Sequence, residues 1–423
     1  MIAKVTRMNE FRRMMQRVLK NKQPERLVIL FLILLIAGLF FSRALLSFAS
    51  VAMVLPFLYH TKDIYQNKLL LFAIGLIFLP VLYSGIYSDD KLRWINSLSV
   101  KIPLLTLFLG LAYTQISERV WNKLILLYLV LVSIGCCWSL WHYFLDPYAI
   151  QQSYLKAKVL ATPADNDYVK FSWMVVTGFF LGVKILGKMP FNRLYLAISC
   201  ILVFLVLYLH LLAAKTGLVC LYAGGIIYLF FICFIQKKWK MGVILFSGIL
   251  IFTVFTYDLF PTLRNRVQYV VYDFGNYSKG HFLPGYNDAA RWLSIKAGYA
   301  VMQENPIMGV GFGDIKKAVT EWDVKNYPAS YEYERFLPTN EWLVYGAGSG
   351  WTGMLLFSIG LLLLLYLTTS KDPVSIILAV ISCIPFITDD SLEGQYGVIL
   401  LTFIAFFGQQ KFSKQEPLYE KPV

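Results

Sequence analysis

Two cationic side chains stand out, one at the expected outer end of a membrane helix and one on the first turn of a helix expected in a long loop. Lys215 lies in the run LLAAKTG between two long apolar stretches, and Arg291 lies in the run NDAARW. Ammonium and guanidinium groups bind phosphate well, so at a membrane surface they could hold a lipid-linked diphosphate. Each cation also has a plainer interpretation. A lysine at a membrane edge is often a snorkelling anchor, and an arginine on a loop helix is often a solvated surface residue.

A glycine-rich run, ENPIMGVGFGD at residues 304–314, follows Arg291 in the chain. Gly309, Gly311 and Gly313 alternate along it, which permits a tight turn with exposed backbone N–H groups that could cradle a phosphate. It is not a dinucleotide-binding fingerprint, since no strand precedes it and the glycine spacing differs. Alone it would be an ordinary turn between helices, but together with the two cations it favours a large anionic headgroup as ligand.

The composition indicates which elements must position these residues. Of the 423 residues, 58% are hydrophobic and only 15% are charged. Apolar runs long enough to cross a bilayer recur along the chain, which a soluble domain would not show. We predict an all-α polytopic membrane protein with about twelve transmembrane helices, near residues 27–42, 44–60, 68–87, 100–116, 122–145, 169–187, 191–211, 215–235, 241–260, 343–368, 374–388 and 394–409.

The predicted helices divide the chain into five parts: a basic tail at 1–26, nine helices within 27–260, a long loop at 261–342, three helices within 343–409 and a tail at 410–423. Short loops rich in Lys and Arg stay in the cytoplasm. If both termini are cytoplasmic, the inner segments hold 22 Lys and Arg against 8 in the short outer loops. The long loop is then periplasmic, and its apolar spacing predicts two surface helices, at 288–305 and 314–322.

The sequence carries no signature of a metal or cofactor. The four histidines are scattered, at His60, His142, His210 and His281, and no spacing typical of a metal site joins them to cysteines. All six cysteines lie in apolar runs, which favours helix packing over disulfide bonds. The net charge of +14 is concentrated in the loops predicted to be cytoplasmic, so we expect membrane lipids as partners and no nucleic acid.

The order of the motifs resembles the O-antigen ligase and O-antigen polymerase superfamily. The resemblance covers roughly residues 205–360: a basic residue at an outer helix end, Arg-Trp in a long external loop, the run NPIMGVGFG, and NEWL leading into a glycine-rich helix. It implies a metal-independent, inverting glycosyltransferase without a cofactor. The donor would be a glycan on undecaprenyl diphosphate at the periplasmic face of the bacterial inner membrane. In the ligase branch the acceptor would be a lipid A–core sugar.

Two positions depart from the family pattern. Lys215 stands where an arginine is usual, which keeps the charge but loses the bidentate fork. Thr339 stands where a histidine is usual, and threonine cannot act as a general base near neutral pH. In the ligases that histidine is proposed to handle the acceptor hydroxyl. His281 in the same loop and Glu341 after Asn340 are the candidate substitutes, unless charge on the leaving diphosphate makes a base unnecessary.

We therefore predict an O-antigen ligase. The candidate catalytic residues are Lys215, Arg291, His281 and Glu341, and the candidate substrate-binding residues are Thr339, Asn340, Gly309, Gly311 and Gly313. A repeat-unit polymerase of the same superfamily is the nearest alternative, and the missing histidine favours it. An inactive scaffold stays open for the same reason. A small-solute transporter is more distant, because no internal repeat is visible and the distinctive residues gather at one face.

The predicted orientation can be tested with reporter fusions. A reporter that is active only in the periplasm should be active when fused after Tyr331 and silent when fused after Lys238, because the charge asymmetry places these points on opposite sides. Activity measured in intact cells checks this, and the reverse pattern would overturn the orientation.

Overall fold

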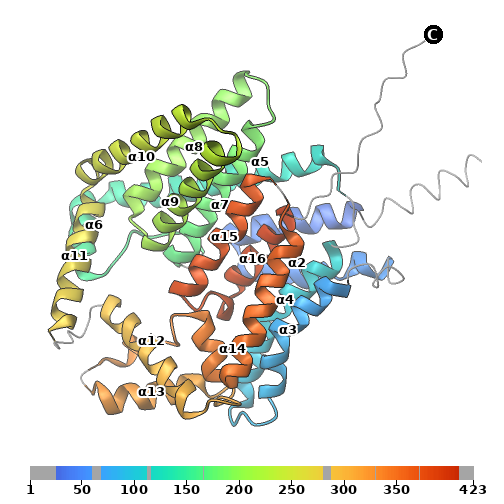
Figure 1. Cartoon of the computed structure of the whole chain (residues 1–423), viewed down its shortest axis with the longest axis vertical. Coiled ribbons are helices and arrows are strands. Elements are labelled where there is room, and N and C mark those ends of the chain that lie inside the picture. Colours follow the sequence, from blue (N-terminus) through green and yellow to red (C-terminus); the bar gives the residue numbers. More distant parts are fainter. Residues whose placement is uncertain are drawn as a thin grey trace, which may run out of the picture.

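A computed structural model of the protein describes residues 25–59, 68–111, 116–164, 166–279, 287–328, 330–370 and 372–408. The described residues form helices, turns and loops without a strand, which confirms the all-α prediction (Figure 1). His60 and His281 lie outside the described residues.

Within the described residues, seven helices are long and apolar enough to cross a membrane, judged by length and composition. Three of them carry residues treated below: α7 (Tyr168–Leu186), α9 (Lys215–Phe230) and α14 (Glu341–Thr368). The other four are α4 (Lys91–Leu111), α5 (Glu118–Leu145), α8 (Arg193–Leu212) and α10 (Trp239–Leu259). A π-helical turn, Phe231–Ile235, extends α9.

Shorter apolar helices complete the bundle. These are a helix over residues 25–41, α2 (Arg43–Ala52) with the 3-10 turn Leu55–Tyr59, α3 (Lys68–Ser84), α15 (Pro373–Thr388) and α16 (Gln395–Gly408). Each predicted transmembrane helix overlaps a helix of the structure, because apolar runs of this length are specified locally. The count of twelve spans stays a prediction, since these shorter helices do not reach the length of the seven.

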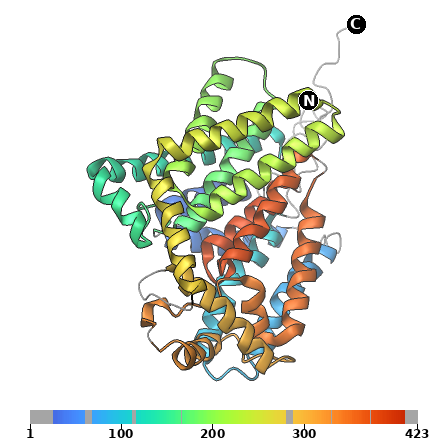
Figure 2. The ribbon, with the colours of Figure 1, turned by 60° about the vertical axis from the view of Figure 1, so that its left-hand side comes forward.

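The predicted long loop is mostly helical. It contains α11 (Pro261–Ser278), α12 (Asn287–Glu304) and α13 (Ile315–Asn326). The sequence predicted the last two but not α11, whose residues are too polar to reveal it. Figures 1 and 2 show α11 running from the end of α10 toward α12, with α12 and α13 together at one end of the helix bundle.

Helix α14 is broken near its start, whereas the sequence predicted one continuous helix. Ser349 and Gly350 have non-helical dihedral angles, and Gly350 has a φ of +67°. The break lies against α3, where the hydroxyl groups of Tyr83 and Ser349 bond to the carbonyl oxygens of Ser349 and Pro80. A break in a buried helix frees backbone groups that need new partners.

The glycine-rich run supplies those partners. The N–H groups of Val310 and Gly311 donate to the carbonyl oxygens of Ala347 and Gly348 at 2.8 and 3.0 Å, and the Trp351 N–H donates to Pro306 O at 2.8 Å. Gly309 approaches so closely that an added Cβ would lie 2.4 Å from Ser349 N, and its φ is +68°. The run therefore repairs the helix break, and only glycine fits at position 309.

Replacing Gly309 should destabilise the protein. Gly309→Ala forces a side chain into backbone at a left-handed residue, so we expect a loss of about 1–3 kcal/mol in the free energy of unfolding. Gly248→Ala is the matched control, because a Cβ there meets nothing within 4 Å. Unfolding by SDS in mixed micelles measures both. Equal stability of the two variants would contradict this account of the turn.

Candidate functional site

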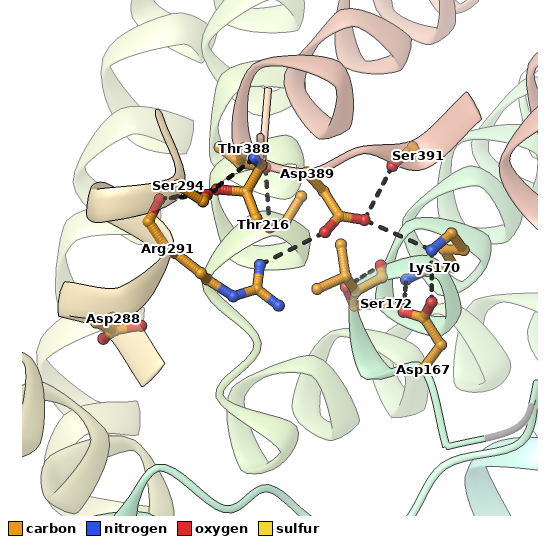
Figure 3. Close-up of polar contacts among 12 residues, drawn as sticks. Asp167, Lys170, Ser172, Thr216, Asp288, Arg291, Ser294, Thr388, Asp389 and Ser391 are labelled. Carbon is orange, nitrogen blue, oxygen red and sulfur yellow. Dashed lines mark hydrogen bonds and ion pairs between the residues drawn. The ribbon is translucent and has the colours of Figure 1, made fainter. Parts of the chain in front are cut away.

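The site is built around the first turn of α12, at the end of the bundle where α7, α9, α12 and α15 meet. Figure 3 shows Arg291 and Lys170 pointing toward Asp389 from opposite sides. Arg291 Nη1 lies 3.5 Å from Asp389 Oδ1, and Lys170 Nζ lies 3.5 Å from Asp389 Oδ2. Lys170 also pairs with Asp167 at 2.6 Å. One carboxylate is thus shared between two cations that come from distant parts of the chain.

Local structure fixes each member of this cluster. Asp167 caps α7 by accepting a hydrogen bond from Lys170 N at 3.0 Å, which places both at the helix start. Asp389 follows the last residue of α15 in extended backbone, and Ser391 donates to its Oδ2 at 3.2 Å. Because the carboxylate is held on several sides, it can hold Arg291 in a defined position.

A second cluster lies one turn away on α12. Asp288 Oδ2 lies 2.5 Å from Lys215 Nζ, and Asp288 Oδ1 lies 3.9 Å from Arg266 Nη2. Lys215 begins α9 just after the left-handed residue Ala213, which ends α8. Since Asp288 and Arg291 are three residues apart on one helix, α12 joins the two clusters.

The charges of the Arg291 cluster influence one another. Burial alone would lower the pKa of Arg291, but Tyr168, Asp389 and Asp390 raise it above its ordinary value. Burial, followed by repulsion from Asp389, raises the pKa of Asp390 above its ordinary value. The cluster therefore combines a fixed cation with a buried carboxyl group whose neutral form is favoured.

Thr339 and Asn340 support the site through bonds to the protein. Thr339 is buried; its hydroxyl donates to Arg291 O at 3.1 Å, and its N–H donates to Ser294 Oγ at 3.1 Å. The Asn340 side chain caps α14 and also donates to Ile387 O at 3.0 Å. These contacts tie the first turn of α12 and the end of α15 to the start of α14.

Glu341 is fully buried, and its Oε2 accepts a hydrogen bond from Leu392 N at 3.0 Å. Next to Leu392, Glu393 forms an ion pair with the buried Lys101 at 2.5 Å. Glu341 thus contacts the segment that follows Asp389. The described structure records no contact between Glu341 and Arg291, whereas Asp389 does contact Arg291.

The glycines lie away from the two cation clusters, in the turn that repairs the break in α14. Gly309, Gly311 and Gly313 donate their N–H groups to Asn305 O, Gly348 O and Ser88 Oγ, at 3.0, 3.0 and 2.9 Å. Instead of being exposed, as the sequence suggested, these donors are engaged within the protein.

Five residues of the candidate site were not predicted from the sequence. They are the carboxylates Asp288, Asp389 and Asp390 and the cations Lys170 and Arg266. One signal was available: Asp389 and Asp390 follow directly on a predicted helix, at the face where the cations were expected. Among the described residues, no group of three or more His, Cys, Asp or Glu could hold a metal ion.

Fold and site together define a helical membrane protein with paired cations and carboxylates at one end of its bundle. Residues 200–358 match the family model of O-antigen ligase, and this similarity over part of the chain confirms the resemblance to the O-antigen ligase and polymerase superfamily seen in its motifs. The match includes Lys215, Arg291 and Thr339, while Lys170 and Asp389 lie outside it. No curated protein matches the chain.

Proposed function

We propose that the protein is an O-antigen ligase, which transfers a glycan from undecaprenyl diphosphate to a lipid A–core sugar at the periplasmic face of the inner membrane. One observation carries the proposal. Arg291 lies on the first turn of α12 and pairs with Asp389, and Lys215 pairs with Asp288 of the same turn; both cations are inside the family match. Two cations gathered at one helix turn suit the two phosphates of a lipid-linked donor.

The cations would stabilise the diphosphate as it leaves. Negative charge grows on the leaving oxygen while the sugar–oxygen bond breaks, and fixed positive groups lower the energy of that state. In the free protein Asp288 and Asp389 neutralise Lys215 and Arg291. A diphosphate carries more charge than one carboxylate and can compete for the cations. Ammonium and guanidinium groups can supply this charge without a metal ion.

The transfer would proceed by inversion. The oxygen of an acceptor hydroxyl attacks the anomeric carbon from the face opposite the diphosphate. A new carbon–oxygen bond forms as the bond to the phosphate oxygen breaks, and the diphosphate leaves with the electron pair. The hydroxyl proton passes to a base.

We propose Asp389 as that base. Its contact with Arg291 supports this role, because a diphosphate bound to Arg291 would lie close to Asp389. The Thr339 hydroxyl already bonds to Arg291 O, and the Glu341 carboxylate bonds to Leu392 N. Thr339 would then be a positioning residue, holding the turn that carries Arg291. The alternative bases are His281, in the same external loop and outside the described residues, and Glu341, whose Oε1 has no hydrogen-bond partner among the described residues.

A repeat-unit polymerase of the same superfamily is the second candidate. It would use the same donor and the same leaving group, and only the acceptor would differ. The observation that favours it is Thr339, at the position where the ligases usually carry a histidine.

Arg291→Ala should insert and fold normally yet lose glycan transfer by about a hundredfold or more, because a charge aimed at the leaving group is missing. Lys215→Arg should keep substantial activity, since the charge remains. Arg264→Ala is the matched control, an exposed arginine on α11. Transfer rates of purified protein with a lipid-linked glycan measure all three. Arg291→Ala at the parental rate would refute the role of Arg291.

The glycan pattern of a deletion strain separates ligase from polymerase. Loss of a ligase leaves lipid A–core without glycan while full-length chains accumulate on the carrier. Loss of a polymerase leaves core with a single repeat unit. We expect the first pattern on lipopolysaccharide gels, restored by the intact protein. Single-repeat bands would assign the polymerase, and an unchanged profile would exclude both.

A further inference from the structure

Arg266, on α11, is a buried cation that the proposed reaction does not use. Only 3% of the residue is exposed, and its guanidinium lies over the Tyr269 ring, 5.1 Å from the centroid. Its Nε and Nη1 atoms have no hydrogen-bond partner among the described residues. A buried guanidinium with unsatisfied donors is costly, so such an arrangement persists only where another gain offsets it.

The acid that faces Arg266 is Asp288, which it shares with Lys215. Asp288 lies 2.5 Å from Lys215 Nζ but 3.9 Å from Arg266 Nη2, beyond hydrogen-bond distance. The exposure of the two cations differs sharply, at 44% for the Lys215 side chain and 4% for that of Arg266. Asp288 thus stands between a cation that a substrate can reach and a buried one that it cannot.

Hydrogen bonds fix the backbone beside Asp288, whereas its carboxylate can move toward Arg266. The Asp288 N–H donates to Tyr269 Oη at 3.3 Å, and the Ala289 N–H donates to Asp273 Oδ2 at 2.9 Å. Tyr269 and Asp273 lie on the same helix as Arg266, so α11 holds the start of α12 in place. A side-chain rotation that moves the Asp288 carboxylate by about 1 Å would bring it within hydrogen-bond distance of the Arg266 guanidinium.

We propose that Arg266 is a positioning residue that takes over the Asp288 carboxylate when the donor's diphosphate binds Lys215. This inference rests on the proposed function. Without Arg266, the diphosphate would displace a buried carboxylate and leave it without a counter-ion. With Arg266 present, Asp288 exchanges one cation for another, and the free guanidinium donors gain an acceptor. In the free protein Arg266 is therefore the cation to which Asp288 moves when it leaves Lys215.

Binding of inorganic diphosphate to the purified full-length protein tests the exchange by isothermal titration calorimetry. Arg266→Met should weaken binding by about tenfold, because Asp288 then stays on Lys215 or is left uncompensated. The double variant Arg266→Met/Asp288→Asn should bind within about threefold of the wild type, because Lys215 is free from the start. Arg264→Met, an exposed arginine on the same helix, is the matched control and should bind like the wild type.

A merely structural Arg266–Asp288 pair gives a different pattern. The double variant would then bind no better than Arg266→Met, and that result would overturn the exchange. If Arg266→Met does not accumulate, Asp288→Asn alone decides. Binding at least as tight as in the wild type supports the exchange, and weaker binding overturns it.

Lys215→Met separates this inference from the proposed function. If the wild type binds inorganic diphosphate no better than Lys215→Met does, Lys215 is not a diphosphate ligand, and the proposed function loses its basis. If Lys215→Met binds weakly while Arg266→Met binds like the wild type, only the exchange is overturned.

Discussion

A cation at the edge of an apolar helix bundle needs a carboxylate within reach, because an unpaired buried charge costs several kcal/mol. This requirement shapes the whole site. Lys170 and Arg291 share Asp389, and Lys215 pairs with Asp288. In the free protein these three cations are thereby paired with carboxylates, and a ligand gains them only by displacing the carboxylates. On the proposed function the donor's diphosphate does this, which a neutral glycan cannot do because it carries no charge.

The start of α14 holds this arrangement together. Thr339 bonds to the turn that carries Arg291, Asn340 to the end of α15, and Glu341 to the segment after Asp389. Three consecutive residues therefore fix the partners of the central ion pair. Thr339 lies where the ligases usually carry a histidine, and it contacts the backbone of Arg291 directly. A residue at this position can thus serve the site by positioning, without itself accepting a proton.

The sequence predicted the apolar helices and α12 well, because hydrophobic runs and helical spacing are local properties of the chain. It predicted Lys215 and Arg291 as site residues, since a cation near the end of an apolar helix can be recognised from the sequence alone. It missed Asp389, because the Arg291–Asp389 pair joins residues that only the tertiary fold brings together. The glycine run was misleading for a similar reason. We expected its N–H groups to be exposed, but several donate to carbonyl oxygens at a break in α14, and that break could not be predicted from the sequence.

Binding of the donor's diphosphate by Lys215 and Arg291 can be seen in an electron cryo-microscopy structure of the full-length protein with undecaprenyl diphosphate. We expect phosphate oxygens within about 3 Å of both Lys215 Nζ and the Arg291 guanidinium, with the Lys215–Asp288 and Arg291–Asp389 pairs opened. A diphosphate bound elsewhere, with both ion pairs intact, would contradict this expectation.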